Sequence, residues 1–206
     1  MNADAAAAAP PDLLAADGGR LLAALRHLLA EKGIAAPGEI AERIAVTERA
    51  SPRLGAAMVA RAWCDPAFRA LLLADGTAAA ESLGIAMRGL PPLGVLENTP
   101  ALHHLVVCTL CSCYPRAVLG YPPFWFKSAA YRARAVRDPL GLLAEFGTAL
   151  PAGQRVRVVD STADYRWMVL PLRPAGTEGW SEDRLAACLD AGDLVGATVP
   201  GPEARP

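Results

Sequence analysis

Three cysteines lie within six consecutive positions of this chain, at Cys108, Cys111 and Cys113. Thiolates this close together can bind one metal ion with little help from the rest of the chain. A Cys-x-x-Cys pair alone would suit a tetrahedral zinc site or a redox disulfide. The closing Cys-Ser-Cys is different, because its two sulfurs are too close along the chain for two ordinary tetrahedral ligand positions. The spacing therefore predicts a metal site of another kind.

The sizes of the chelate rings indicate what this segment suits. The sulfur and the backbone nitrogen of Cys113 close a five-membered ring with a metal. The backbone nitrogen of Ser112 adds a five-membered ring with the nitrogen of Cys113 and a six-membered ring with the sulfur of Cys111. Two sulfurs and two amide nitrogens can thus lie in one plane, with Cys108 as a fifth ligand and one position open, as in catalytic sites. Ionised amides and thiolates together favour a strongly Lewis-acidic trivalent ion over zinc.

Strands are expected on both sides of this loop. The cysteines directly follow residues 102–107, an apolar segment that we predict to be a buried strand, so the loop hangs at the end of a rigid element. A preceding strand is expected at residues 93–97. Residues 155–160 and 165–170 alternate, and we expect them to pair with each other, while residues 194–199 are expected to form a closing strand.

Helices are predicted along the rest of the chain from apolar spacing and capping residues. They are expected at 18–32, 38–50, from Ser51-Pro52, from Asp65-Pro66, at about 77–83 ending at Gly84, at 116–119, at 122–137, from Asp138-Pro139 to Gly147, and from Ser181. Residues 1–17, rich in Ala and Pro, are expected to be a disordered tail. The predicted fold class is α+β, with an N-terminal helical region at 18–90 and an α/β catalytic domain at 91–206 that carries the metal-binding loop 108–113.

Composition limits the class of protein. The 206 residues are 53% hydrophobic, which is ample for a core, and the net charge of −1 gives no electrostatic case for nucleic acid or an anionic membrane. No apolar run approaches the roughly 20 residues of a membrane span, and the N-terminus has no convincing secretion signal. We therefore expect a cytoplasmic protein with reduced cysteines, in which Cys64 and Cys188 are buried small apolar residues.

The cysteine segment closely resembles the metal-binding loop of the alpha subunit of nitrile hydratase, Val-Cys-[Thr/Ser]-Leu-Cys-Ser-Cys. The resemblance is strong from about residue 95 to 200, weaker from about 20 to 94, and implies that family's layered α/β/β/α fold. Beyond the loop it rests on Glu97-Asn98-Thr99-Pro100, Leu119-Gly120, Pro122-Pro123, Tyr131-Arg132, Leu143-Ala144-Glu145-Phe146-Gly147, Met168-Val169-Leu170-Pro171 and Arg173-Pro174-Ala175-Gly176-Thr177-Glu178-Gly179-Trp180.

The resemblance implies a non-corrin Co(III) or non-haem Fe(III) ion. Its ligands would be Cys108, Cys111, Cys113 and the amides of Ser112 and Cys113. Cys111 would be oxidised to sulfinic acid and Cys113 to sulfenic acid. The reaction would be hydration of a nitrile to its amide, with the metal polarising the nitrile or activating water. Cys113, Ser112 and Cys111 would be the catalytic residues, the sulfenate of Cys113 acting as nucleophile or base.

Two neighbouring positions favour cobalt, with Fe(III) as the alternative. Thr109 and Tyr114 are the residue types that the family's cobalt members usually carry, whereas its iron members usually carry Ser and Thr. Tyr114 is also expected to line the substrate pocket.

Arg116 departs from the family pattern, which usually has Trp directly after Tyr-Pro. An arginine brings a fixed positive charge and planar donors to the substrate pocket. It would suit a polar substrate such as a nucleoside nitrile, as in the toyocamycin-type nitrile hydratases. It would also suit the anion handled by the gamma subunit of thiocyanate hydrolase. A third reading is that Arg116 points elsewhere and pairs with an acid.

The resemblance also implies partners. A beta-type subunit, split into two chains in some subfamilies, would supply arginines to the oxidised sulfurs, and a metallochaperone or activator is possible. The small-molecule partner would be the nitrile. The alternatives are a thiocyanate hydrolase gamma-type subunit and a non-enzymatic thiol-rich metal-binding module.

Four further residues are open to two interpretations. His103 and His104 could be metal ligands, but in a strand they point to opposite faces, so we expect hydrogen-bonded or surface histidines. Arg132 and Arg134 could hydrogen-bond the ligands of a negatively charged metal site, or could be solvated helix charges.

Overall fold

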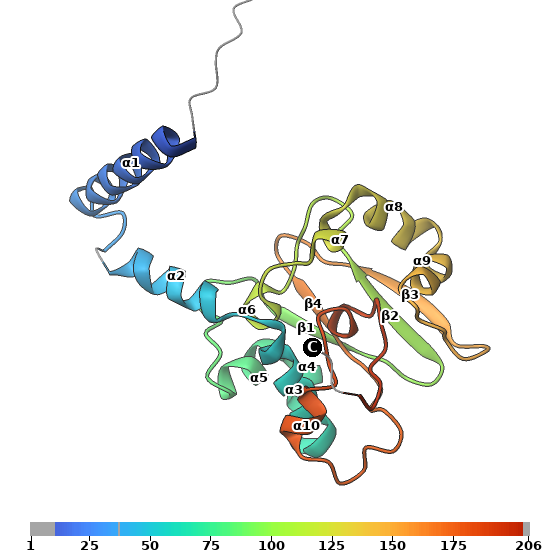
Figure 1. Ribbon diagram of the computed structural model, residues 1–206. Helices are drawn as coiled ribbons and strands as arrows, with labels where there is room; N and C mark the ends of the chain where they lie inside the picture. Colours follow the sequence, from blue (N-terminus) through green and yellow to red (C-terminus); the bar gives the residue numbers. More distant parts are fainter. Residues whose placement is uncertain (1–10, 37, 204–206) are drawn as a thin grey trace, which may run out of the picture. The chain divides into compact units, whose positions relative to one another are not determined.

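The computed structural model describes residues 11–36 and 38–203 (Figure 1). The chain divides into two compact units, one up to Ala45 and one from Val46 onward. The first contains α1 (Pro11–Glu31) and the start of α2 (Glu39–Arg49). Helix α1 begins at Pro11 instead of residue 18, because proline is favoured in the first helical turn and the following Leu and Ala residues are good helix formers. The rest of the predicted tail, residues 1–10, lies outside the described residues.

The second unit begins with three consecutive helices, α3 (Pro52–Cys64), α4 (Pro66–Ala74) and α5 (Gly76–Ser82). The Asp65 carboxylate accepts hydrogen bonds from the backbone N–H groups of Ala67 and Phe68, as the Asp-Pro signal predicted. Ser51 holds the N-cap position of α3 in an extended conformation, but its side chain makes no capping hydrogen bond. The helices end within a few residues of the expected positions.

Three strands have the expected bounds and β4 starts one residue later than expected, but one expected pairing is wrong. β1 (Leu93–Glu97) pairs in parallel with β4 (Arg166–Leu170), and β2 (Leu102–Val107) pairs in parallel with β3 (Arg155–Asp160). β3 and β4 are therefore neighbours in sequence that join different sheets. Alternation of apolar residues reveals which face of a strand is buried, and it carries no information on the partner strand.

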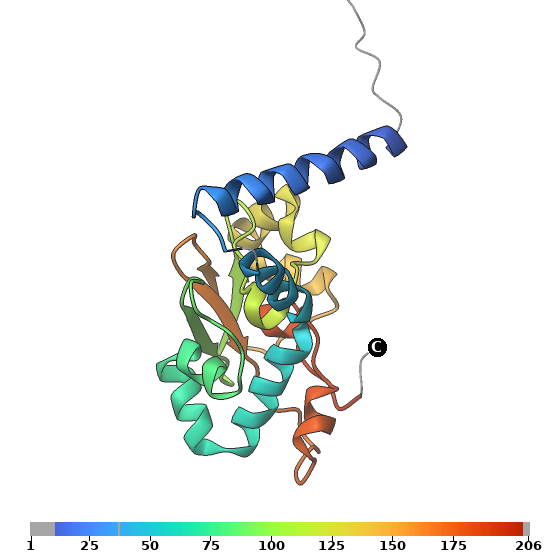
Figure 2. The same cartoon turned by 90° about the vertical axis from the view of Figure 1, so that its left-hand side faces the viewer.

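The second unit is layered. Helices α4 and α5 contact β1, and α8 (Ala129–Arg137) and α9 (Pro139–Glu145) contact β2 and β3 (Figures 1 and 2). The two sheets contact each other through β2, which packs on both β1 and β4. All residues of β2 beyond Leu102 are buried, as expected for a strand between two layers. The α/β/β/α order predicted from the resemblance is confirmed, and so is the α+β class.

The segment expected to be one helix at 122–137 is interrupted. Helix α6 (Arg116–Leu119) has the predicted bounds, but α7 (Phe124–Lys127) ends at Ser128 before α8 starts. Ser128 is extended and its hydroxyl accepts a hydrogen bond from the backbone N–H of Tyr131, so it is an N-cap rather than a helix interior residue. The last α-helix of the described residues is α10 (Glu182–Ala186).

The expected strand at 194–199 is wrong. This apolar segment forms a short 3-10 helix, η1 (Asp193–Val195), followed by Gly196 in the left-handed region at φ 75°. A Cβ at Gly196 would lie 1.9 Å from the carbonyl oxygen of His104, so the turn packs directly on β2. Leu194 and Val195 are apolar because they are buried against the sheets, and a short buried turn has the same composition as a buried strand.

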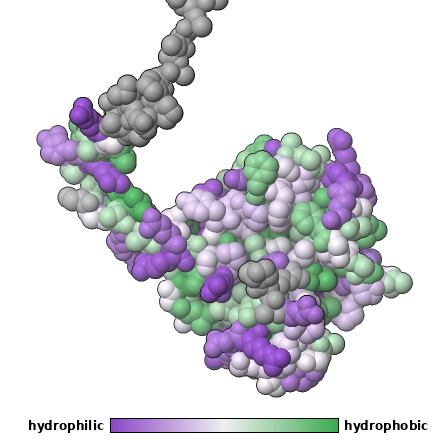
Figure 3. All heavy atoms as spheres, viewed as in Figure 1, coloured by the Kyte–Doolittle hydropathy of each residue, from purple (hydrophilic) through white to green (hydrophobic). Residues whose placement is uncertain are grey.

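The surface carries both hydrophilic and hydrophobic residues, as expected for a chain that is 53% hydrophobic and 20% charged. On the face shown in Figure 3, hydrophilic residues are spread over the second unit with smaller hydrophobic areas between them. No helix among the described residues is long and apolar enough to cross a membrane; the cytoplasmic setting stays a prediction. Cys188 is buried as expected, whereas Cys64 is exposed because it lies on the outer side of the last turn of α3.

Candidate metal centre

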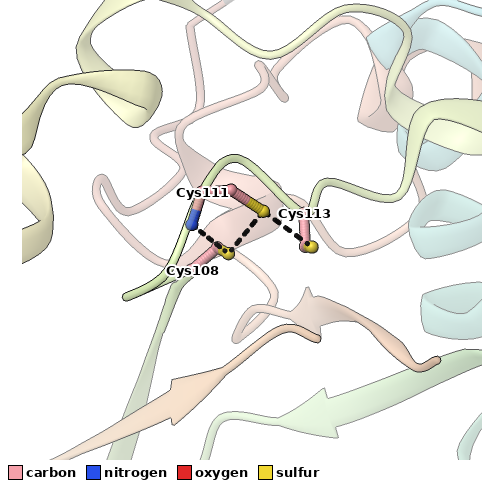
Figure 4. A group of neighbouring side chains, drawn as sticks. All are labelled: Cys108, Cys111 and Cys113. Carbon is pink, nitrogen blue, oxygen red and sulfur yellow. Dashed lines mark hydrogen bonds between the residues drawn. The ribbon is translucent and has the colours of Figure 1, made fainter. Parts of the chain in front are cut away.

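The three loop cysteines converge. Directly after β2, the chain turns so that the sulfur of Cys111 lies 3.6 Å from that of Cys108 and 3.3 Å from that of Cys113 (Figure 4). All three sulfurs lie within 4.8 Å of one another, and all three cysteines are free thiols. Cys108 and Cys113 are buried, while Cys111 is exposed. Among the described residues, this is the group of thiol, imidazole and carboxyl side chains that could hold a metal ion.

Side chains from two other elements hold the loop. Asp160, the last residue of β3, accepts hydrogen bonds from the backbone N–H of Thr109 at 3.0 Å and from the Thr109 hydroxyl. The parallel register sets Asp160 beside Val107, which places its carboxylate at the end of the sheet where the loop starts. From α8, Arg132 donates to the carbonyl oxygen of Leu110 at 2.8 Å.

The electrostatic environment distinguishes two of the thiols. The hydrogen bond with the Cys113 thiol lowers the pKa of Cys111, and the backbone N–H of Ser112, the Cys108 thiol and the backbone N–H of Cys113 lower it further. Burial raises the pKa of Cys113 to about 11, against the opposing effect of a hydrogen bond from Arg166. The amides of Ser112 and Cys113 therefore lie close to the sulfur of Cys111.

A pocket of about 350 Å³ opens beside the loop. Cys111, Ser112 and Cys113 form one side of it, and Arg116 and Tyr114 also line it, so all five of these predicted site residues meet at one cavity. The remaining lining residues are mostly apolar: Met87, Leu90, Pro91, Leu93, Pro115, Ala117 and Val118, together with Arg166. A cavity of this size and character can enclose a small organic molecule.

Arg116 and Tyr114 differ in exposure within this pocket. Arg116 is exposed, and its guanidinium lies over the ring of Tyr121 at 5.3 Å from the ring centre, so it makes a cation–π contact. Tyr114 is 2% exposed, packs edge-on against Phe126, and its hydroxyl has no hydrogen-bond partner in the described structure. Burial raises the pKa of this hydroxyl, which keeps it protonated as a donor.

Two residues of the site were missed from the sequence. Arg166 starts β4, lies opposite Leu93 in the parallel register, and reaches the sulfur of Cys113. One terminal nitrogen of its guanidinium is buried without a partner in the described structure. Asp160 ends β3 and fixes Thr109. Both residues lie more than forty positions from the loop. In the sequence, each appears only as a charged residue at the end of a predicted strand. Such a residue can be assigned to the loop only when the pairing of the strands is known.

The structure decides between the two interpretations given for His103, His104, Arg132 and Arg134. His103 and His104 are buried and share Asn98: the Asn98 amide contacts His103 Nδ1 at 3.1 Å, and its oxygen accepts from the backbone N–H of His104 at 2.8 Å. Neither histidine belongs to the group around the cysteine sulfurs. Arg132 contacts the loop, whereas Arg134 pairs with Glu145 and Asp138.

The donor set fits a metal ion. Three free sulfurs lie within reach of one ion, two backbone amides lie close to one of these sulfurs, and Cys111 is the thiol whose ionised form is favoured. Soft thiolates with amide nitrogens suit a trivalent first-row ion better than a hard cation such as Mg²⁺.

Comparison with known proteins decides the family. The family model for the nitrile hydratase alpha chain matches residues 17–198. The chain belongs to the nitrile hydratase alpha-chain family. It is 48% identical over 178 residues to the low-molecular weight cobalt-containing nitrile hydratase subunit alpha of Rhodococcus rhodochrous, covering 86% of each chain. It is 41% identical over 190 residues to the thiocyanate hydrolase subunit gamma of Thiobacillus thioparus, covering 87% of this chain and 78% of that one.

Solved structures of both kinds share the fold. A double mutant of the Fe-type nitrile hydratase from Comamonas testosteroni Ni1 matches with a TM-score of 0.76 at 41% identity, covering 93% of this chain and 95% of that chain. A recombinant thiocyanate hydrolase with partially modified cobalt centres matches with a TM-score of 0.78 at 39% identity, covering 92% and 95%. The nitrile hydratase alpha-chain family is a family of enzyme subunits, and the resemblance inferred from the cysteine loop is confirmed. Its members include cobalt and iron types, and thiocyanate hydrolase is a close relative.

Proposed function

We propose that this chain is the metal-binding subunit of a nitrile hydratase that acts on a polar nitrile. The observation that carries the proposal is the convergence of the Cys108, Cys111 and Cys113 sulfurs beside a pocket that Cys111, Cys113 and Arg116 line. Cys108, Cys111, Cys113 and the amides of Ser112 and Cys113 would hold the ion. Co(III) is favoured over Fe(III), in line with the names of the cobalt-containing relatives.

The chemistry that the ion supplies when bound is Lewis acidity toward a nitrile. The chain's own residues orient the substrate and limit access of water to it. The Ser112 hydroxyl lies at the pocket wall within the loop, where it can hydrogen-bond a polar substrate atom. Met87, Leu90 and Leu93 give the pocket part of its apolar lining. Arg116 offers charged donors to ring nitrogens or sugar hydroxyls of a larger substrate.

Oxidation of two thiols is part of the proposal. With dioxygen as oxidant, Cys111 takes up two oxygen atoms to become a sulfinic acid, and Cys113 takes up one to become a sulfenic acid. At Cys111 both atoms of one dioxygen molecule bind to the sulfur, R–SH + O2 → R–SO2H. At Cys113 one dioxygen molecule supplies the sulfenic oxygens of two chains, 2 R–SH + O2 → 2 R–SOH, so that sulfur is oxidised, oxygen is reduced and no atom is left over. The Arg166 guanidinium beside Cys113 can donate to the oxygen that this step adds.

A beta-type subunit completes the proposed enzyme. The two relatives described above are named as subunits. Large apolar side chains are exposed within the loop and shortly after it in the sequence, including Leu110 at 87%, Tyr121 at 67% and Phe124 at 86%. Apolar side chains exposed to this extent mark surfaces that bind other proteins. A cytoplasmic location and delivery of the metal by an activator protein belong to the same proposal.

The deciding experiment is co-expression with the beta-type subunit in cobalt-supplemented cells, followed by metal analysis, mass spectrometry of the loop peptide and activity assays. We expect one cobalt ion per chain of this subunit. In the loop peptide, Cys111 should carry two added oxygen atoms and Cys113 one. The complex should convert a nucleoside nitrile to its amide. Zinc at one equivalent with unmodified cysteines would instead identify a metal-binding module without this activity.

One observation favours a second function. Arg116 places a positive charge in the pocket, which would attract thiocyanate, and a thiocyanate hydrolase subunit is among the close relatives. The same purified complex is therefore assayed with thiocyanate. Turnover of thiocyanate without turnover of any nitrile would replace the first function by the second.

A further inference from the structure

Two hydrogen bonds at the loop share one peptide group. Arg132 Nη1 donates to the carbonyl oxygen of Leu110 at 2.8 Å. The backbone N–H of Cys111 donates to the sulfur of Cys108 at 3.2 Å (Figure 4). The Leu110 carbonyl and the Cys111 N–H are the two ends of the same planar amide. A guanidinium therefore lies at one end of this amide and a loop sulfur at the other.

An amide transmits polarisation from its oxygen to its nitrogen. Resonance links the two atoms, and a charged donor on the oxygen increases the double-bond character of C–N and the positive charge on the N–H. Hydrogen bonds in a chain strengthen one another for this reason. The N–H of Cys111 is thus a stronger donor to Cys108 with Arg132 present than without it.

The position of Arg132 is fixed by its helix. The hydroxyl of the neighbouring Tyr131 donates to the carbonyl oxygen of Val106 at 2.8 Å, which fastens α8 to the strand that carries the loop. The Nε of Arg132 is buried and has no hydrogen-bond partner in the described structure. Burial of an unpaired donor is unfavourable, so packing alone does not explain an arginine here. Its exposed neighbour Arg134 pairs with carboxylates and does not contact the loop.

We propose that Arg132 is a positioning residue for the metal ligand Cys108 and acts on it through the Leu110–Cys111 peptide group. The inference rests on the proposed metal-binding function. Arg132 holds the loop and strengthens the N–H···S hydrogen bond to Cys108. A thiolate that accepts a stronger hydrogen bond donates less electron density to its metal. Arg132 therefore sets the donor strength of one ligand without contacting any sulfur.

The test uses the cobalt-loaded complex and three variants: Arg132→Met, Arg132→Gln and, as the matched control on the same helix, Arg134→Met. Two quantities are measured for each, the equilibrium affinity of the complex for cobalt and the energy of the sulfur-to-cobalt charge-transfer absorption. Arg132→Met removes the charged hydrogen bond that holds the loop, and this loss is expected to weaken cobalt binding about tenfold even though Cys108 becomes a stronger donor. It is also expected to move the charge-transfer band to lower energy, because the Cys108 lone pairs are less stabilised. Arg132→Gln keeps a neutral donor, so its cobalt affinity and band energy are expected to lie between those of Arg132→Met and the wild type. Arg134→Met is expected to match the wild type in both quantities.

The outcomes separate the possible roles of Arg132. Weaker binding with an unmoved band in Arg132→Met would overturn the inference and leave Arg132 with a loop-holding role only. No change in either quantity would overturn it as well. Failure of the wild-type complex to bind cobalt would contradict the proposed function itself, and is distinguished by using the unmutated complex first. Circular dichroism of each variant checks that the fold is retained before the two quantities are compared.

Discussion

Asp160 accepts two hydrogen bonds from Thr109, one from the backbone N–H and one from the hydroxyl. Asp160 is the last residue of β3 and Thr109 is the second residue of the cysteine loop, so these hydrogen bonds connect the strand to the loop. We expect Asp160→Ala to leave the loop free at this end and to lower cobalt affinity about tenfold, since two hydrogen bonds to a carboxylate are lost. Cobalt titration of the complex measures this.

A matched variant separates the two hydrogen bonds. Thr109→Ser keeps both donors and should behave like the wild type, whereas Thr109→Val keeps only the backbone donor and should fall between. If Thr109→Val and Asp160→Ala both bind cobalt as tightly as the wild type, Asp160 does not support the site.

Arg116 is expected to set the substrate preference. Arg116→Trp removes the charge from the pocket and adds an apolar wall, so we expect kcat/KM to shift by at least about tenfold from a nucleoside nitrile toward benzonitrile. Arg116→Lys keeps the charge and should keep the preference for polar substrates. An unchanged ratio of kcat/KM values in Arg116→Trp would place the Arg116 side chain outside the substrate's reach.

Leu110 is expected to anchor the partner subunit. Its side chain is 87% exposed although it lies between two loop cysteines, a position where an apolar residue gains from being covered. We expect Leu110→Ser to weaken the Kd for the beta-type subunit about tenfold by isothermal titration calorimetry. Leu83→Ser, at the end of α5 and 43% exposed, serves as the control with a similar change of surface. Equal effects of the two substitutions would remove Leu110 as an anchor.

The stability of the chain should fall as the pH falls through the ordinary histidine range. Burial lowers the pKa of His103, and burial together with the nearby Arg157 lowers that of His104. Below about pH 6.5 the unfolded chain therefore binds protons that the folded chain does not, so stability is full above this pH and declines below it. Thermal unfolding between pH 5.5 and 7.5 measures the slope.

Two histidine variants test which side chain causes this dependence of stability on pH. His103→Gln should flatten it, because a buried group that resists protonation is removed. The exposed His27 lies 3.5 Å from Glu31 and serves as the control, since His27→Gln should leave the slope unchanged. A slope that stays the same in His103→Gln would show that another group controls this pH range.

Much of the molecule follows from local sequence signals. The bounds of β1, β2 and β3 and the capping of α4 by Asp65 were predictable, because alternation and capping depend on residues close together in sequence. The pairing of β3 with β2 was not, since strand partners are chosen by packing of whole layers. Gly196 shows the same limit: its left-handed turn is recognisable only once His104 is seen against it.

Part of the site could likewise be predicted from the sequence, and part could not. The convergence of the Cys108, Cys111 and Cys113 sulfurs follows from their spacing, and so does the position of Ser112 beside them. Asp160 and Arg166 could not be found from the sequence, because each reaches the loop only through a parallel strand pairing.

The distance along the chain between Thr109 and Asp160 has a consequence for biosynthesis. During translation Thr109 is made 51 residues before Asp160, whose carboxylate holds it, and Leu110 is made 22 residues before Arg132. The motif is therefore made before either of the side chains that hold its loop. The hydrogen bonds from Thr109 to Asp160 can form only once β3 has been made, so we expect the cobalt delivery proposed above to follow completion of β3.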